Sequence, residues 1–201
     1  SVAEGIGIRA AAKISRLPKA KNKLIRTIQV FFQGLFLVGP NVLLNKRYLD
    51  VVPETITGVD LSKSIAKLCA KLNKKIFLLG AAPGVAEKTA QKLKSSYNGL
   101  IVSGCYPGSP KKEEEQEIIS RINKAQPDVL LVAYSFPQQD IWISRNLDKF
   151  NKPLIAMGVG GTFDFISGKV KRAPHSWRKL GLEWLYRLIQ EPTKRASRIW
   201  Q

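Results

Sequence analysis

Short apolar runs that alternate with helical segments are the feature that most limits how this chain can fold. Four such runs lie after residue 61, at 75–80, 99–104, 129–134 and 153–161. The segments between them are about 10–15 residues long and place apolar residues at helical spacing. Strands that are apolar on both faces need helices over both faces, which is typical of parallel sheets. The sequence therefore predicts a three-layer α/β fold with a Rossmann-like parallel sheet.

The chain changes character after Gly168. The segment that follows combines an apolar helical stripe with many Lys and Arg side chains. We therefore predict a main domain over residues 1–168 and a basic helical appendage over residues 169–201.

The charge balance points to anionic partners. The 201 residues include 33 Lys and Arg against 15 Asp and Glu, a formal net charge of +18. Nucleic acid, nucleotide phosphates, lipid pyrophosphates and anionic lipid head groups all fit this excess. Cys69 and Cys105 lack metal-ligand spacing, and two cysteines in a chain of this size are weak evidence for a disulfide. A reducing, cytoplasmic setting fits this best.

The most apolar stretch, residues 28–44, is interrupted by glutamines, glycines and a proline. A membrane span needs about 20 mostly apolar residues in a row. Basic residues on both sides fit an amphipathic helix that lies at a membrane surface. A transmembrane span, a surface helix and a buried helical hairpin remain open here, and the pattern favours the hairpin.

Ligands of open parallel sheets bind at the carboxyl ends of the strands. Gly80 to Gly84 follows the first run, and this turn either binds an anion or only packs tightly. Gln139 and Asp140 follow the third run, where they either contact a ligand or cap the next helix. Glycines at 158, 160 and 161 allow a ligand close to the backbone, and Asp164 offers a carboxylate to a ribose.

Several kinds of chemistry are disfavoured. The glycines fit neither a dinucleotide fingerprint nor a P-loop. There is no Asp-x-Asp pair and the only histidine is His175, so we expect no metal site and no cofactor. His175 lies next to Ser176, and sequence neighbours rarely form a catalytic triad.

Two long motifs carry a resemblance to a known family. G-K-V-K-R-A-P at 168–174 and G-L-E-W-L-Y-R-L-I-Q-E-P at 181–192 resemble the C-terminal signature of the WecG/TagA/CpsF glycosyltransferases. Shorter matches lie upstream: T-G-V-D-L at 57–61, F-L-L-G at 77–80, P-Q-Q-D at 137–140 and G-V-G-G-T-F-D at 158–164.

The resemblance implies an inverting, metal-independent transferase. Such an enzyme moves N-acetylmannosamine or a related sugar from a UDP donor to polyprenyl-diphosphate-linked N-acetylglucosamine. The product feeds teichoic-acid, enterobacterial common antigen or capsular polysaccharide synthesis. It also implies a peripheral position on the inner face of the bacterial cell membrane, with an anionic membrane surface as partner. Homo-oligomerisation stays open.

The resemblance also implies site residues. Glu4 stands where the family has its catalytic-base Asp in Asp-Gly-x-Gly, and Gln139 matches the site glutamine. Asp164 matches the carboxylate near the nucleoside. The residues predicted to bind substrate are Gly80, Gly160, Gly161, Asp164, Arg172, Arg187, Arg195 and Arg198, where the last three, with Lys194, fall among the appendage arginines that reach toward the diphosphate.

The sequence departs from the family pattern at several positions. Glu4 is one methylene longer than Asp, Thr55 replaces an expected Arg, and Pro107-Gly108 replaces an expected Asp-Gly. Residues 20–50 do not match the family pattern, which implies an apolar insertion in the main domain. The chain begins at the base motif, and the family segment with an active-site Thr-x-Asn has no counterpart in it. Either that segment precedes the given sequence, as we expect, or this lineage has lost part of its acceptor site. Two alternatives stay open: a catalytically silent, membrane-associated member, and a basic nucleic-acid-binding protein.

Overall fold

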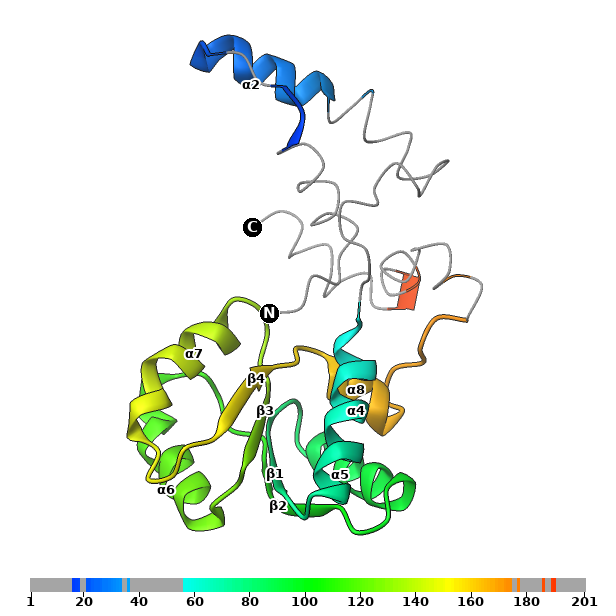
Figure 1. Cartoon of the computed structure of the whole chain (residues 1–201), viewed down its shortest axis with the longest axis vertical. Helices are drawn as coiled ribbons and strands as arrows, with labels where there is room; N and C mark the ends of the chain where they lie inside the picture. The colour runs from blue at the N-terminus through cyan, green and yellow to red at the C-terminus, as the bar shows by residue number, and fades with distance from the viewer. Residues whose placement is uncertain are drawn as a thin grey trace. The chain divides into compact units, whose positions relative to one another are not determined.

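A computed structural model describes residues 16–18, 21–33, 36, 56–174, 177, 186 and 189–190. Within it, residues 57–172 form a compact α/β unit (Figure 1). Its elements in chain order are α4 (Gly58–Lys71), β1 (Lys75–Gly80), α5 (Val85–Ser96), β2 (Ile101–Tyr106), η3 (Lys112–Glu114), α6 (Glu115–Ala125), β3 (Val129–Ala133), α7 (Gln138–Asn146), η4 (Leu147–Lys149), β4 (Ile155–Gly158) and α8 (Thr162–Ser167).

The described strands form one parallel sheet in the order β2-β1-β3-β4. This confirms the predicted α/β class with a Rossmann-like parallel sheet. β2, which follows β1 in the sequence, lies on one side of β1, and β3 lies on the other side. The direction of strand addition therefore reverses between β1 and β3, which is where open α/β sheets bind ligands.

Helices cover both faces of the sheet. Alternate side chains of a strand point to opposite faces, so Ile76 and Leu78 of β1 join a core with α4, α5 and α8. Phe77 and Leu79 of the same strand join a second core with α6 and α7. Figure 1 shows these two helical layers on either side of the strands. The runs of β1 and β3 are thus buried on both faces, as their composition predicts. Those of β2 and β4 are only partly buried, because these strands lie at the edges of the described sheet.

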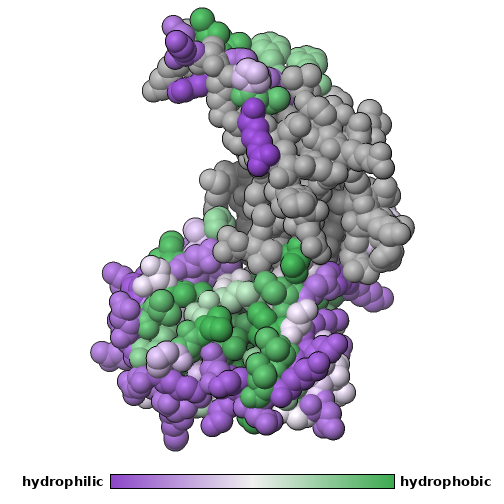
Figure 2. Space-filling model, viewed as in Figure 1, coloured by the Kyte–Doolittle hydropathy of each residue, from purple (hydrophilic) through white to green (hydrophobic). Residues whose placement is uncertain are grey.

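β4 lies at an outer edge of the described sheet. It pairs with β3 alone among the described strands, and the side chain of Ile155 is 68% exposed. Figure 2 shows apolar side chains on this face of the compact unit, framed by hydrophilic ones.

Helix α2 (Lys23–Phe32) belongs to a separate unit of the chain. The hairpin interpretation of this region predicts buried apolar side chains. Those of Ile28, Phe31 and Phe32 are instead more than half exposed. These exposed side chains do not fit that interpretation, and residues 34, 35 and 37–44 of the stretch lie outside the described residues. No helix among the described residues combines the length and apolar character needed to cross a bilayer.

Candidate functional site

The carboxyl ends of β1, β3 and β4 lie side by side and form the base of the candidate site. Gly80 is paired in register with Ala133, and Val132 with Gly158. A Cβ on Gly80 would lie 2.9 Å from the carbonyl carbon of Ala133, and its φ is +98°. Only glycine suits such a position. The packing interpretation of this turn is therefore sufficient to explain Gly80, and its role in substrate binding stays a prediction.

Gln139 lies in the first turn of α7 and is only 5% exposed. Its Oε1 accepts a hydrogen bond from the backbone N–H of Gly160 at 2.8 Å. Gly158 permits this contact, because a Cβ there would lie 2.5 Å from the side-chain amide of Gln139. The alternative that this side chain only caps α7 is wrong, since no side chain caps that helix and Gln139 bonds the β4–α8 loop instead.

The orientation of the Gln139 amide follows from its partner. A backbone N–H can only donate, so the atom facing Gly160 is the oxygen and the nitrogen is directed elsewhere. In the described part of the chain Nε2 donates to no protein acceptor, and it is not fully buried. Gln139 therefore offers one amide donor at the carboxyl edge of the sheet.

The β4–α8 loop is built from glycines and one hydroxyl. The N–H of Val159 donates to Val132 O at 2.8 Å, and the hydroxyl of Thr162 donates to Val159 O at 2.6 Å. Gly160 has a φ of +52°, and Gly161 precedes α8. The N–H of Gly160 is already committed to Gln139, so the predicted contact of Gly160 with a ligand would need another part of its backbone.

Asp164 lies in the first turn of α8, with one third of its side chain exposed. Lys169 Nζ lies 4.0 Å from its Oδ1. Its backbone carbonyl accepts from the N–H of Val170 at 3.0 Å, which fixes the chain just after the helix. The carboxylate is therefore placed near the β4–α8 loop, with one cation beside it.

Arg172 is held by two residues of the T-G-V-D-L motif. Its Nη1 and Nη2 donate to the two carboxylate oxygens of Asp60, each at 2.8 Å, and Nη2 also donates to Thr57 Oγ1 at 2.9 Å. Thr57 in turn caps α4 by accepting from the N–H of Asp60 at 3.2 Å. The structure thus joins two motifs that the sequence shows far apart, and the predicted substrate-binding Arg172 has a fixed protein partner.

The sequence analysis did not predict that Asp60 pairs with Arg172. The signal available in the sequence is Thr57-x-x-Asp60 at a helix start, because an acidic residue in the first turn favours a nearby cation. Tyr134, directly after β3, was also missed. Burial raises the pKa of Tyr134, and its hydroxyl is buried without a hydrogen-bond partner in the described part of the chain.

Four predicted site residues, Glu4, Arg187, Arg195 and Arg198, lie outside the described residues. Their predicted roles remain predictions. The described members of the predicted set are Gly80, Gln139, Gly160, Gly161, Asp164 and Arg172. Of these, Gln139 and Gly160 are brought together by a direct hydrogen bond.

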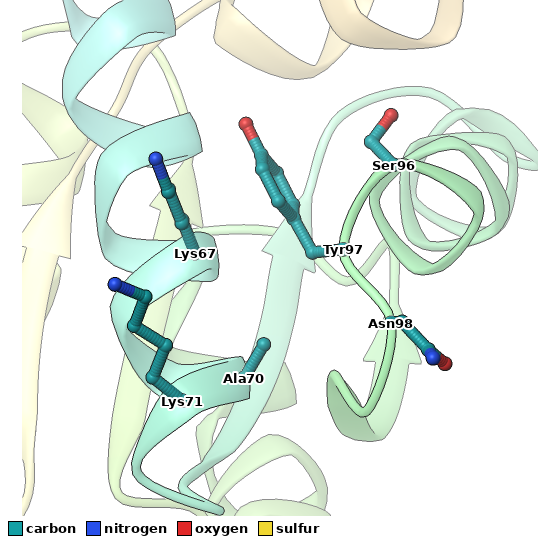
Figure 3. Close-up of a pocket in the computed structure, with 6 residues that line it drawn as sticks. All are labelled: Lys67, Ala70, Lys71, Ser96, Tyr97 and Asn98. Atoms are coloured by element: carbon teal, nitrogen blue, oxygen red, sulfur yellow. The ribbon is translucent and has the colours of Figure 1, made fainter.

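The described pockets lie elsewhere. One, of about 270 Å³, is lined by the last turns of α4 and α5, including Lys67, Lys71 and Tyr97 (Figure 3). Helices that follow parallel strands end at the amino edge of the sheet, opposite the site. A second, of about 390 Å³, lies against β2 and includes Cys105. Burial raises the pKa of the Cys105 thiol to about 11, so this thiol is a poor nucleophile.

Comparison with protein families settles the family. Residues 36–201 match the model of the glycosyl transferase WecG/TagA/CpsF family. The chain belongs to this family. It is therefore a transferase of the glycosyltransferase class, and the family acts in cell-surface polysaccharide synthesis. The matched range includes Gln139, the β4–α8 loop and Arg172, whereas Glu4 and α2 precede it.

Proposed function

We propose that this protein transfers N-acetylmannosamine or a related sugar from a UDP donor to polyprenyl-diphosphate-linked N-acetylglucosamine. Family membership supports a glycosyl transfer. The observation that carries the site assignment is Gln139, whose oxygen is fixed by Gly160 and whose amide nitrogen is left as a donor. A buried, oriented amide at the carboxyl edge of the sheet is suited to position a sugar hydroxyl or phosphate.

The proposed reaction is a single displacement with inversion. A hydroxyl oxygen of the acceptor attacks the anomeric carbon of the donor, and the bond from that carbon to the diphosphate oxygen breaks. UDP leaves with the bonding electrons. The carboxylate of Glu4 takes the acceptor proton as general base, and Gln139 holds the reacting groups in place.

The leaving diphosphate needs positive charge as it departs. We assign this role to the appendage arginines Arg187, Arg195 and Arg198, because a guanidinium pairs with phosphate oxygens in a bidentate way. Gly80, Gly161 and Arg172 are further candidates for substrate contact, and Asp164 is assigned to the ribose hydroxyls. The acceptor is a lipid, so we place the reaction at the inner face of the bacterial cell membrane.

The test is a transfer assay on the full-length protein. UDP release and product mass are measured with a polyprenyl-diphosphate-N-acetylglucosamine acceptor and a panel of UDP-sugars. We expect one added sugar residue, with the highest rate from UDP-N-acetylmannosamine or a close relative. Absence of both UDP binding and transfer across the panel would refute the proposal.

The catalytically silent alternative is separated by two variants at one position. Glu4→Asp restores the base of the family motif and is expected to retain transfer. Glu4→Gln removes the base and is expected to abolish it. Equal activity of the two variants would exclude Glu4 as the base, and binding of a specific DNA sequence near physiological salt would favour the nucleic-acid alternative.

A further inference from the structure

Helix α2 exposes a group of large apolar side chains. The side chains of Ile25, Ile28, Phe31 and Phe32 are each more than half exposed, and Phe31 is 65% exposed. Phe36 continues this face, because its ring stacks on that of Phe32 with centroids 5.8 Å apart. Clusters of large apolar side chains rarely stay exposed in soluble proteins unless they bind something.

Two polar side chains of α2 are hydrogen-bonded to one backbone carbonyl. The side-chain amides of Gln29 and Gln33 both donate to the carbonyl of Pro18, at 2.9 and 3.2 Å. These two residues and Val30 are only partly exposed. On a helix, positions 29 and 33 lie one turn apart, and position 29 is also one turn from Ile25, so the two glutamines border the apolar face. Their hydrogen bonds tie this border of α2 to Pro18, while the side chains of Ile28, Phe31 and Phe32 stay exposed.

The charge around α2 indicates what covers this face. Residues 5–49 contain no Asp or Glu. The same stretch contains nine basic residues, namely Arg9, Lys13, Arg16, Lys19, Lys21, Lys23, Arg26, Lys46 and Arg47. An apolar helical face with aromatic rings and flanking cations is the pattern that binds at the boundary between lipid head groups and acyl chains.

A second copy of the chain suits this face poorly. Each copy carries a formal charge of +18. In a dimer formed through this face, residues 5–49 of the two copies, whose charged side chains are all basic, would come together. Like charges brought together in this way oppose association. An anionic bilayer instead supplies both the apolar layer and the negative charge.

We propose that the exposed face of α2, formed by Ile25, Ile28, Phe31, Phe32 and Phe36, inserts into the surface of an anionic lipid bilayer. The helix is too short to span a membrane and lies along its surface. This inference goes beyond the proposed transfer reaction, because α2 precedes the residues matched by the family and does not contain the predicted site residues. Lipid binding is also measurable without any sugar donor.

The experiment is co-sedimentation of the full-length protein with vesicles. One set contains phosphatidylglycerol and phosphatidylcholine, and the other contains phosphatidylcholine alone. We expect binding to the anionic vesicles that weakens as salt is raised. The double variant Phe31→Ser/Phe32→Ser is expected to reduce the partition coefficient about tenfold or more, since two large apolar side chains no longer enter the lipid.

The matched control is Leu68→Ser/Leu72→Ser, which removes two exposed apolar side chains from the end of α4. It is expected to bind vesicles like the wild type. Circular dichroism and UDP binding report whether each variant is folded, and Ile28→Gln provides a milder second test of the same face.

Unchanged vesicle binding by folded Phe31→Ser/Phe32→Ser and Ile28→Gln variants would overturn the proposal. So would a lipid-free dimer that these variants dissociate while vesicle binding persists. Loss of transfer with vesicle binding intact would count against the proposed reaction alone.

Discussion

Arg172 and Asp60 form a two-pronged ion pair between residues that are 112 positions apart in the sequence. The two nitrogens lie 2.8 Å from the two carboxylate oxygens, and the hydroxyl of Thr57 bonds both partners. Thr57 and Arg172 are also the first and last residues of the compact unit formed by residues 57–172. The cluster therefore ties the beginning of that unit to its end, where Arg172 is the arginine of the G-K-V-K-R-A-P motif.

The first prediction concerns the energy of this cluster. In a double-mutant cycle with Arg172→Ala and Asp60→Ala, we expect a coupling free energy of about 1 kcal/mol, because the geometry is bidentate although Asp60 is half exposed. The measurement is the free energy of unfolding in urea. The Arg121–Glu117 pair on α6 is the control, because both of its side chains are exposed, and it should give a smaller coupling free energy.

The same variants separate two roles of Arg172. If Arg172 contacts substrate, Arg172→Ala lowers kcat/KM for transfer well below that of Asp60→Asn. If Arg172 only positions the chain, the two variants lose activity in parallel, because each breaks the same pair. We expect the first result, and equal activities would assign Arg172 a positioning role alone.

The second prediction separates the two ends of the Gln139 side chain. Gln139→Glu keeps an acceptor for the Gly160 N–H but removes the Nε2 donor, so a larger loss of turnover than of stability is expected. Gln139→Leu removes both, and the unsatisfied N–H of Gly160 should cost about 1–3 kcal/mol of unfolding free energy. Steady-state transfer rates and urea unfolding are compared, with the exposed neighbour Gln138→Glu as control. Normal turnover in Gln139→Glu would contradict the role of the amide donor.

The third prediction tests the contact that orients Gln139. Gly158→Ala places a methyl group 2.5 Å from the amide of Gln139, and the side chain must move. We expect a stability loss of about 1–3 kcal/mol from overpacking and a fall in transfer activity. Gly84→Ala is the control, since no atom lies within 4 Å of its added Cβ and only its positive φ is strained. Folded Gly158→Ala with full activity would show that the position of this amide is unimportant.

The fold could be predicted largely from local patterns. Runs such as residues 75–80 and 129–134 are apolar on both faces, and this property depends only on neighbouring residues. The strand order could not be predicted in the same way. It depends on which face of the sheet each connecting helix covers, and α5 and α6 lie on opposite faces because of packing between distant residues.

The same limit applies to the candidate site: individual residues could be predicted from the sequence, but the contacts between them could not. Gln139 was found because two glutamines and a carboxylate directly after a buried strand have no role in the core. Its actual partner, the N–H of Gly160, could not be found, because a backbone group has no sequence signature. Asp60 and Arg172 were each visible in a motif, but their pairing depends on how α4 and the segment after α8 meet.

The last prediction concerns Asp128, at the opposite edge of the sheet. Its carboxylate accepts from Lys152 Nζ and from the N–H of Lys75, each at 2.8 Å, so these hydrogen bonds lower its pKa from 3.8 to about 2. A group whose pKa is lower in the folded protein stabilises the fold at pH values above its pKa in the unfolded chain, and this contribution is lost as the pH falls from about 4 through about 2.

From this shift, Asp128→Asn is expected to cost about 1–2 kcal/mol at pH 7 and much less near pH 2. Urea unfolding at both pH values, with the exposed Asp148→Asn as control, measures the difference. A cost that stays the same at both pH values would mean that Asp128 stabilises the sheet through its shape and not through its charge.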